Sequence, residues 1–280
     1  MAEQALRTVL AGEEAYLVGG VVRDELLGRP VLDVDVACHE PERAALDYRR
    51  TAGGAVFPLS ERHGAWRVAL PGGRTVDFTR LAGTIEADLA GRDFTINAIA
   101  VPLAGGEAVD PHGGRQDVTA RLVRAVSERV FRDDPLRLLR AVRLEDELGF
   151  RLEAGTEELV RRDAALVTAP AGERILSELL RLTGSGYARL AELRLLAPLG
   201  GSSGRLDHLP GTASPELRLV AALGQAVDRL PVSNETRRLA RTLLSARRPA
   251  DASRREIHRF RRSTEPWALD ALAFLGELTC

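Results

Sequence analysis

The stretch Tyr16-Leu17-Val18-Gly19-Gly20-Val21-Val22-Arg23-Asp24 organises the first part of the chain. Its apolar beginning predicts a buried strand, which the two glycines end. Residues 21–27 predict a short helix that Gly28, Arg29 and Pro30 terminate. Residues 31–37 then alternate apolar and acidic side chains, the period of two that is typical of a strand with one solvent-facing side. The sequence thus predicts a strand, a glycine turn, a helix and a second strand in direct succession.

Asp33 and Asp35 lie two positions apart on that second strand, so their carboxylates face the same side. Two adjacent carboxylates repel each other and require a cation or a proton. Mg²⁺ is usually held by one or two carboxylates together with substrate phosphates. The turn at Gly19 and Gly20 begins a helix whose N–H groups favour phosphate, and Arg23 can add a contact to a triphosphate. The combination predicts a nucleotide–Mg²⁺ site, although the Asp-x-Asp pattern alone more often marks an exposed edge strand.

A third carboxylate and a further arginine lie beyond this stretch. Asp77 lies on a predicted strand, residues 74–79. If this strand neighbours the strand of Asp33 and Asp35, Asp77 joins the metal site and could help to deprotonate an attacking hydroxyl. Taken alone, Asp77 is more simply explained as a surface residue of a strand. Arg92 lies in a polar segment next to core residues and could reach a phosphate.

The segment Asp133-Asp134-Pro135-Leu136-Arg137 predicts a helix start, because proline and acidic residues favour the first turn. One Asp and one Arg can offer an acceptor and donors to the edge of a base, while further arginines hold phosphates. A solvated helix face with weak ion pairs, such as one between Asp133 and Arg137, is the alternative. Four residues of this helix are spaced by three and fan across about half of its circumference: Asp134, Arg137, Arg140 and Arg143.

Length and composition describe a globular protein. The 280 residues, 45% hydrophobic and 28% charged, are enough for a substantial core and more than one domain. The net charge of −1 gives no overall basic character, so nucleic-acid binding must depend on local patches. No apolar run reaches the roughly 18 residues of a membrane span, and the N-terminal segment is polar. We therefore expect a cytoplasmic protein without membrane contact.

The second half of the chain has a different pattern. Near residue 117 it changes from mixed strands and helices to almost wholly helical periodicity. Residues 237–262 contain ten arginines against two acidic residues. With helical spacing these arginines suit a phosphate backbone, although a merely solvated helix surface explains them equally well. The candidates for RNA contact are Arg254, Arg255, Arg261 and Arg262.

Together these stretches resemble the class II tRNA nucleotidyltransferase and bacterial poly(A) polymerase family, within the polymerase-β-like nucleotidyltransferases. The similarity runs from about residue 15 to 185 and rests on five motifs in the family's order. The motifs are LVGGVVRDELLG at 17–28, Asp33-Val34-Asp35, DLAGRDFTINA at 88–98, DPHGG at 110–114 and DDPLRLLR at 133–140, followed by a neck-like segment at 173–179.

The resemblance implies an α+β fold in three parts. Residues 1–117 would form a nucleotidyltransferase head with a small mixed β-sheet and helices. Residues 118–185 would form an all-α neck that carries the nucleotide-selecting motif. Residues 186–280 would form a shortened helical body and tail that contacts RNA.

The resemblance also implies roles for individual residues. Mg²⁺ would be bound by Asp33 and Asp35, and Asp77 falls where the family has a third carboxylate. Asp134 and Arg137 would select C or A without a nucleic-acid template. The residues implied to contact the nucleotide or to support that selection are Gly19, Gly20, Arg23, Arg92, Arg140 and Arg143.

The implied reaction is in-line attack of a tRNA 3′-hydroxyl on the α-phosphate of CTP or ATP, with release of pyrophosphate. Three features depart from most members of the family. Asp133 replaces a usual Glu, the body and tail are reduced, and the segment between Asp77 and Asp88 is short. In this family a missing loop at that segment is associated with enzymes that add only the two C residues. A partial CC- or A-adding enzyme and a poly(A) polymerase therefore stay open, as does, less readily, a non-catalytic RNA-binding remnant.

Overall fold

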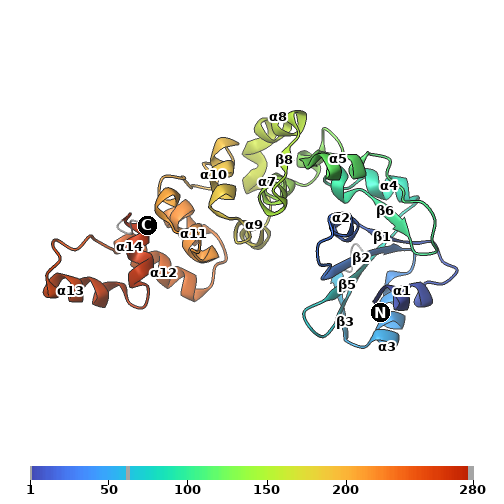
Figure 1. The fold of residues 1–280 in the computed structure, drawn as a ribbon, viewed down its shortest axis with the longest axis horizontal. Helices are drawn as coiled ribbons and strands as arrows, with labels where there is room; N and C mark the ends of the chain where they lie inside the picture. Colours follow the sequence, from blue (N-terminus) through green and yellow to red (C-terminus); the bar gives the residue numbers. More distant parts are fainter. Residues whose placement is uncertain (1, 61–63, 277–280) are drawn as a thin grey trace. The chain divides into compact units, whose positions relative to one another are not determined.

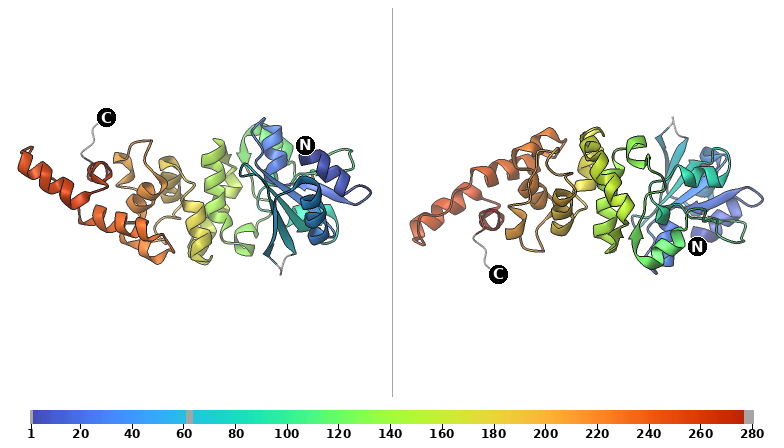
Figure 2. Two further views of the ribbon diagram at one scale, coloured as in Figure 1. Left: turned by 90° about the horizontal axis from the view of Figure 1, so that it is seen from below. Right: turned by 90° about the horizontal axis from the view of Figure 1, so that it is seen from above.

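The computed structural model describes residues 2–60 and 64–276 of the chain (Figure 1). It divides into two compact units, Met1–Glu128 and Arg129–Cys280. The sheet lies among the blue to green segments, and the yellow to red segments are helical (Figure 2). The α+β fold class predicted from the sequence is confirmed.

The first unit is built on a six-stranded mixed sheet with the order β3-β4-β5-β2-β1-β6. Strands β2 and β5 run parallel, and the other neighbouring pairs run antiparallel. The strands are β1 (Ala15–Val18), β2 (Asp33–Cys38), β3 (Ala55–Ser60), β4 (Ala65–Ala69), β5 (Thr75–Arg80) and β6 (Ala100–Pro102).

Two apolar clusters cover the two faces of this sheet. On one face, Val36 and Phe78 pack with Tyr48 in a cluster that also includes residues of α1. On the other face, Ala37 packs with Leu89 of α4. The remaining elements of the unit are α1 (Ala2–Val9), α2 (Gly20–Leu26), α3 (Pro41–Ala52), α4 (Ile85–Ala90), η1 (Thr95–Asn97), α5 (Gly114–Ala120) and β7 (Leu122–Val123).

The elements predicted around the opening stretch are confirmed, with ends displaced by one or two residues. The apolar segment at residues 96–103 has no periodicity that distinguishes a strand from a helix. In the structure it is divided, because η1 ends at Asn97 and β6 begins at Ala100. Both parts are largely buried, so neither shows the alternation of exposed and buried side chains that distinguishes the two periods.

The second unit is a succession of mostly short helices. Serines begin three of them: Ser214, Ser233 and Ser253 each accept a hydrogen bond from the backbone N–H three residues on. The elements are α6 (Val130–Asp133), α7 (Arg137–Leu148), β8 (Arg151–Leu152), α8 (Ala154–Asp163), η2 (Ala164–Thr168), α9 (Gly172–Leu179), α10 (Gly184–Glu192), η3 (Leu206–His208), α11 (Pro215–Leu223), η4 (Gly224–Arg229), α12 (Asn234–Ser245), α13 (Arg254–Thr264) and α14 (Ala268–Phe274).

The helix expected to start at Asp133 does not form as a single helix. Helix α6 ends at Asp133, Asp134 is extended (φ −143°, ψ 101°), and α7 begins at Arg137. Because a residue that precedes proline is disfavoured in the α region, Pro135 accounts for the break at Asp134. Asp133, at the end of α6, lies 3.8 Å from Arg129 Nε.

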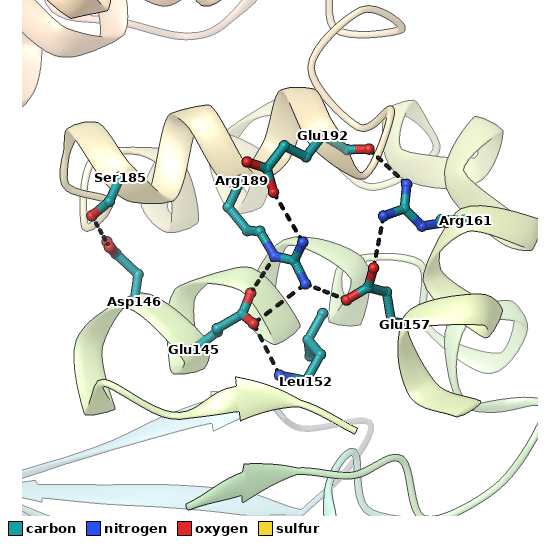
Figure 3. A network of polar contacts seen from close by, with 8 residues as sticks. All are labelled: Glu145, Asp146, Leu152, Glu157, Arg161, Ser185, Arg189 and Glu192. Atoms are coloured by element: carbon teal, nitrogen blue, oxygen red, sulfur yellow. Dashed lines mark hydrogen bonds and ion pairs between the residues drawn. The ribbon is translucent and has the colours of Figure 1, made fainter. Parts of the chain in front are cut away.

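A charged hub, which we define as Arg189 with Glu145, Glu157 and Glu192, joins α10 to α7 and α8 (Figure 3). Arg189 Nε lies 2.8 Å from Glu145, its Nη1 lies 3.0 Å from Glu192, and its Nη2 also pairs with Glu157. Burial lowers the pKa of Arg189, but hydrogen bonds to the three glutamates outweigh it and raise the pKa overall. Every charge of the hub therefore has a partner within the unit.

In the part of the chain that the structure covers, no helix has the length and apolar character that crossing a bilayer requires.

Candidate functional site

The register of the parallel strands brings the predicted carboxylates together. Asp35 of β2 lies directly opposite Asp77 of β5, and Asp33 lies opposite Thr75. The Thr75 hydroxyl donates a hydrogen bond of 2.7 Å to Asp33. The two strands are neighbours, as the third-carboxylate hypothesis required, so all three aspartates lie on one face of the sheet.

Asp35 carries the least compensated charge of this group. Burial, followed by the nearby charge of Asp77, raises the pKa of Asp35 from 3.8 to about 6. The guanidinium groups of Arg92 and Arg67 oppose this rise without cancelling it. A cation placed beside Asp35 would lower the free energy of its ionised form.

Arg67 is a residue of this face that the sequence reasoning missed. Its Nε and Nη2 each donate a hydrogen bond of 2.6 Å to the two carboxylate oxygens of Asp77. The pair follows from the hairpin between β4 and β5, in which residues 67 and 77 lie opposite each other. Counting outward from the Pro71-Gly72-Gly73 turn would have found it. Both carboxylate oxygens of Asp77 are engaged, so a metal or a hydroxyl that reached Asp77 would share them with Arg67.

Gly19 allows the backbone to approach this carboxylate face closely. Its φ is +79°, and a Cβ built there would lie 3.0 Å from Arg92 Nη1 and 3.2 Å from Asp35 Oδ2. Arg92 is anchored by Asp88, which accepts hydrogen bonds of 3.0 and 2.9 Å from its Nε and Nη2. The structure therefore brings together three of the predicted site residues, Gly19, Asp35 and Arg92.

Arg23 lies next to Gly20 at the beginning of α2. A Cβ at Gly20 would lie 3.3 Å from Arg23 Nη2. The Arg23 side chain is buried, and its Nη1 donates a 2.7 Å hydrogen bond to Asn97. Its Nε and Nη2 contact Asp24 at 3.0 Å. Arg23 is thus held in a fixed position beside the glycine turn.

The donor set fits a hard divalent cation such as Mg²⁺. Across residues 2–60 and 64–276, no group of three or more His, Cys, Asp or Glu side chains is arranged to hold a metal. Asp33 and Asp35 supply only carboxylate oxygens, and one or two carboxylates are what Mg²⁺ usually takes when substrate phosphates complete its shell. The under-compensated charge of Asp35 agrees with this fit.

The residues expected to select the base belong to the second unit. Asp134 lies in the extended segment before α7, where it accepts a 3.1 Å hydrogen bond from the Leu136 N–H. It also pairs at 2.8 Å with Arg174 of α9, a partner that the sequence reasoning did not identify. Arg137 and Arg140 are half-buried on α7.

Arg143 differs from these two arginines because it is buried. Its Nε lies 2.7 Å from Glu178 of α9, and its Nη1 lies 3.3 Å from Glu147. Burial lowers the pKa of Arg143 even though Glu178 opposes the change. Its position suits holding α7 against α9 more than touching a ligand.

The four arginines expected to contact RNA all lie on α13 and are exposed: Arg254, Arg255, Arg261 and Arg262. Arg261 lies 4.0 Å from Glu265, which makes at most a loose ion pair. Helix α13 buries Phe260. Most of its exposed charged side chains are arginines, so its exposed surface is mostly positive.

Comparison with known proteins gives consistent matches. Residues 15–82 and 71–124 match the Poly A polymerase head domain family. A CC-adding tRNA nucleotidyltransferase of Geobacter sulfurreducens is 42% identical over 217 residues, covering 76% of this chain and 50% of the relative. An A-adding tRNA nucleotidyltransferase of Deinococcus radiodurans is 45% identical over 188 residues, covering 65% and 43% respectively. A CCA-adding enzyme of Geobacillus stearothermophilus is 38% identical over 232 residues, covering 75% and 55%.

The fold also matches solved structures. A Thermotoga maritima CCA-adding enzyme in complex with tRNA superposes with a TM-score of 0.81 and 23% identity, covering 99% of this chain and 78% of that one. At this identity the match supports the fold alone. The chain spans about half the length of the curated relatives that it matches.

Proposed function

Because the chain belongs to the class II tRNA nucleotidyltransferase family, we propose that it adds C and A from CTP and ATP to the 3′ end of tRNA. The reaction would need no nucleic-acid template and would use Mg²⁺. The observation that carries the proposal is the carboxylate face of the first unit. There, Asp33 and Asp35 lie on one face, and the Gly19 turn and Arg92 adjoin Asp35.

The proposed reaction exchanges a phosphoanhydride bond of the nucleotide for a phosphodiester bond of the RNA. The 3′-oxygen of the RNA forms a bond to the α-phosphorus, and the bond from that phosphorus to the bridging oxygen breaks. Pyrophosphate leaves, and the proton of the hydroxyl passes to a carboxylate or to solvent. Mg²⁺ held by Asp33 and Asp35 would neutralise charge on the phosphates and lower the pKa of the attacking hydroxyl.

The residues of the first unit have separate tasks in this proposal. Arg92, held by Asp88, offers its Nη1 to a phosphate oxygen near Asp35. Gly19 keeps that space free of a side chain, because even a methyl group there would press on both neighbours. Arg67 holds Asp77 in place until the substrate or metal competes for its oxygens.

Base selection falls to Asp134 and Arg137 of the second unit. A carboxylate and a guanidinium can hydrogen-bond to a base edge, and a wrong base leaves those polar groups unpaired. Arg174 shares the Asp134 carboxylate, and Arg143 ties α7 to α9 through Glu178. These contacts would hold the selecting groups in position, so we expect CTP and ATP to be used and UTP and GTP to be rejected.

A CC-adding enzyme is the second candidate, and one observation favours it. Strand β5 ends at Arg80 and α4 begins at Ile85, so only four residues connect them. A connection this short leaves little chain to drive a switch from CTP to ATP. Relatives named as CC-adding and as A-adding enzymes both exist among the matches. A poly(A) polymerase is the third candidate, whereas the retained carboxylates argue against a non-catalytic remnant.

The deciding experiment offers single labelled nucleotides to three tRNA transcripts, ending at the discriminator base, at C and at CC. Incorporation of two C residues followed by A would support the complete enzyme. Arrest after two C residues would favour the CC-adding enzyme. Use of UTP and GTP at the same rate as CTP would contradict base selection by Asp134 and Arg137. Addition of excess EDTA serves as the test for metal dependence.

A further inference from the structure

A pocket in the second unit gathers positive charge that the proposed reaction does not use. It has a volume of about 500 Å³ and lies beside η4 and the end of α11, the helix that Figure 1 labels. Four polar side chains line it above an apolar floor that includes Leu223 and Leu244: Ser202, Arg205, Gln225 and Arg229.

The charge of this pocket has no negative counterpart. Among the residues that the structure describes, no Asp or Glu lines it. Within the same residues, neither Arg205 nor Arg229 forms an ion pair. Two guanidinium groups that face one cavity without a carboxylate favour an anion between them. Arg189 of the same unit is the contrasting case, because three glutamates surround it.

Both arginines are exposed, and each has one close neighbour at the pocket. The guanidinium of Arg205 lies over the ring of Phe274, 5.0 Å from its centroid. Arg229 Nη1 lies 3.3 Å from the position that a Cβ of Gly200 would occupy, and Gly200 has a φ of +82°. Neither contact consumes the N–H groups in a hydrogen bond to a carboxylate. The donors of both side chains therefore stay available to a ligand.

We propose that this pocket binds a phosphate group and that the phosphate belongs to the backbone of bound RNA. The planar fork of a guanidinium matches the oxygens of a phosphate, and two forks can hold one group from two sides. Ser202 and Gln225 add neutral hydrogen-bond partners, and the apolar floor leaves room for a ribose. The volume is in the range of pockets that take small-molecule ligands. The choice of RNA as the source rests on the proposed function, whereas the phosphate chemistry does not.

The first test measures the affinity for a tRNA transcript that lacks the terminal CCA, over a range of salt concentrations. The variants are Arg205→Gln, Arg229→Gln and their combination. Arg151→Gln, at an exposed position of β8, is a control with the same charge change as each single variant. We expect the double variant to bind about tenfold more weakly at low salt. We also expect the slope of log K against log salt to fall by about 0.9 for each phosphate that is no longer bound. The control should match the wild type.

The second test uses inorganic phosphate alone, at constant ionic strength against chloride. Phosphate should raise the Tm of the wild type and of Arg151→Gln, but not of the double variant, because a ligand that binds only the folded state stabilises it. If the double variant does not fold, the pair Arg205→Lys and Arg229→Lys keeps the charge and removes the fork, so it should lose the stabilisation by phosphate while its salt slope stays near that of the wild type.

The outcomes separate the two proposals. If phosphate stabilises through the two arginines while RNA affinity stays unchanged, the pocket takes free phosphate and the RNA source is overturned. If neither RNA affinity nor phosphate stabilisation depends on them, the whole inference is overturned. Nucleotide addition by the wild type is measured in parallel. If the wild type adds no nucleotide but its RNA binding depends on the two arginines, the proposed function is contradicted and the phosphate pocket is supported.

Discussion

The carboxylate of Asp35 in the first unit and the carboxylates of the charged hub in the second have different surroundings. Asp35 faces Asp77, and its pKa is raised to about 6 despite two arginines nearby. Glu157 of the hub receives hydrogen bonds from Arg161 and Arg189, and they hold its pKa below the usual range. The charge of Asp35 needs a substrate or metal to compensate it. The glutamates of the hub are compensated by arginines of the same unit.

This contrast separates residues that act on a ligand or metal from residues that hold the fold together. By spacing alone, Arg137, Arg140 and Arg143 form one series. In the structure Arg143 is buried against Glu178 and belongs with the compensated charges, like the hub. Arg205 and Arg229 belong with the uncompensated ones, although no motif in the sequence drew attention to them. Whether a charge is compensated depends on tertiary contacts. It therefore indicates the role of an arginine in a way that its spacing in the sequence does not.

Removing the uncompensated carboxylate is expected to have the largest effect. Asp35→Asn should reduce nucleotide addition by about 10³-fold or more, because it removes metal and electrostatic stabilisation of the phosphoryl group. Its free energy of unfolding without Mg²⁺ should not fall, since the substitution removes a charge that burial disfavours. Mg²⁺ should raise the Tm of the wild type and leave that of the variant unchanged.

The matched control for this prediction is Asp47→Asn on α3, where the carboxylate already pairs with Arg43 and Arg50. This variant should add nucleotides at the wild-type rate. Activity retained in a folded Asp35→Asn protein would show that the carboxylate face is not the site of reaction.

The sequence predicted most of the first unit because its elements follow local rules. Alternation placed Asp33 and Asp35 on one side of a strand, and the glycine turn ended the strand before it. The family motifs then supplied the order of the parts. The common side of Asp33 and Asp35 could therefore be predicted from the sequence. The place of Asp77 beside them depended on the pairing of β2 with β5.

The remaining features depend on contacts between distant residues. The pairing of Arg67 with Asp77 needed the hairpin register, and that of Asp134 with Arg174 needed the packing of α9. The break at Asp134 was accessible from the sequence, because Pro135 disfavours a helical residue before it. Pro135 lies in the turn two residues before α7 begins, and not in the first turn of a helix.

The base-selecting residues should show the next largest effect. Arg137→Ala should reduce the preference for CTP over UTP by about 10²-fold, because a polar site rejects a wrong base by leaving its own groups unpaired. The measurement is kcat/KM for each nucleotide on a tRNA transcript that ends at the discriminator. Arg129→Ala, which removes a similar side chain one helix earlier, should leave the preference intact. An unchanged preference in Arg137→Ala would remove this residue from the selecting group.

The arginines of α13 should have a smaller effect, confined to RNA affinity. Replacing Arg254, Arg255, Arg261 and Arg262 with Gln should flatten the salt dependence of tRNA binding by about 0.9 for each phosphate that these side chains neutralise. Replacing the exposed Arg49 and Arg50 of α3 serves as the comparison. A slope equal to that of the wild type would mean that α13 presents only a solvated surface.

The charged hub should show the smallest effect on catalysis and a clear effect on stability. Arg189→Met leaves Glu145 and Glu157 without their shared partner, and removing one member of a partly buried network is destabilising. Because Arg189 is 24% exposed, we expect a loss of only ~1–2 kcal/mol in the free energy of unfolding. Arg161→Met, at the exposed margin of the same network, should cost less than half of that. Both variants, assayed well below their Tm, should add nucleotides with unchanged kcat and unchanged preference for CTP. A fall in kcat for Arg189→Met at full folding would show that the compensated charges of the second unit also tune the reaction, and the distinction between acting and holding residues would fail there.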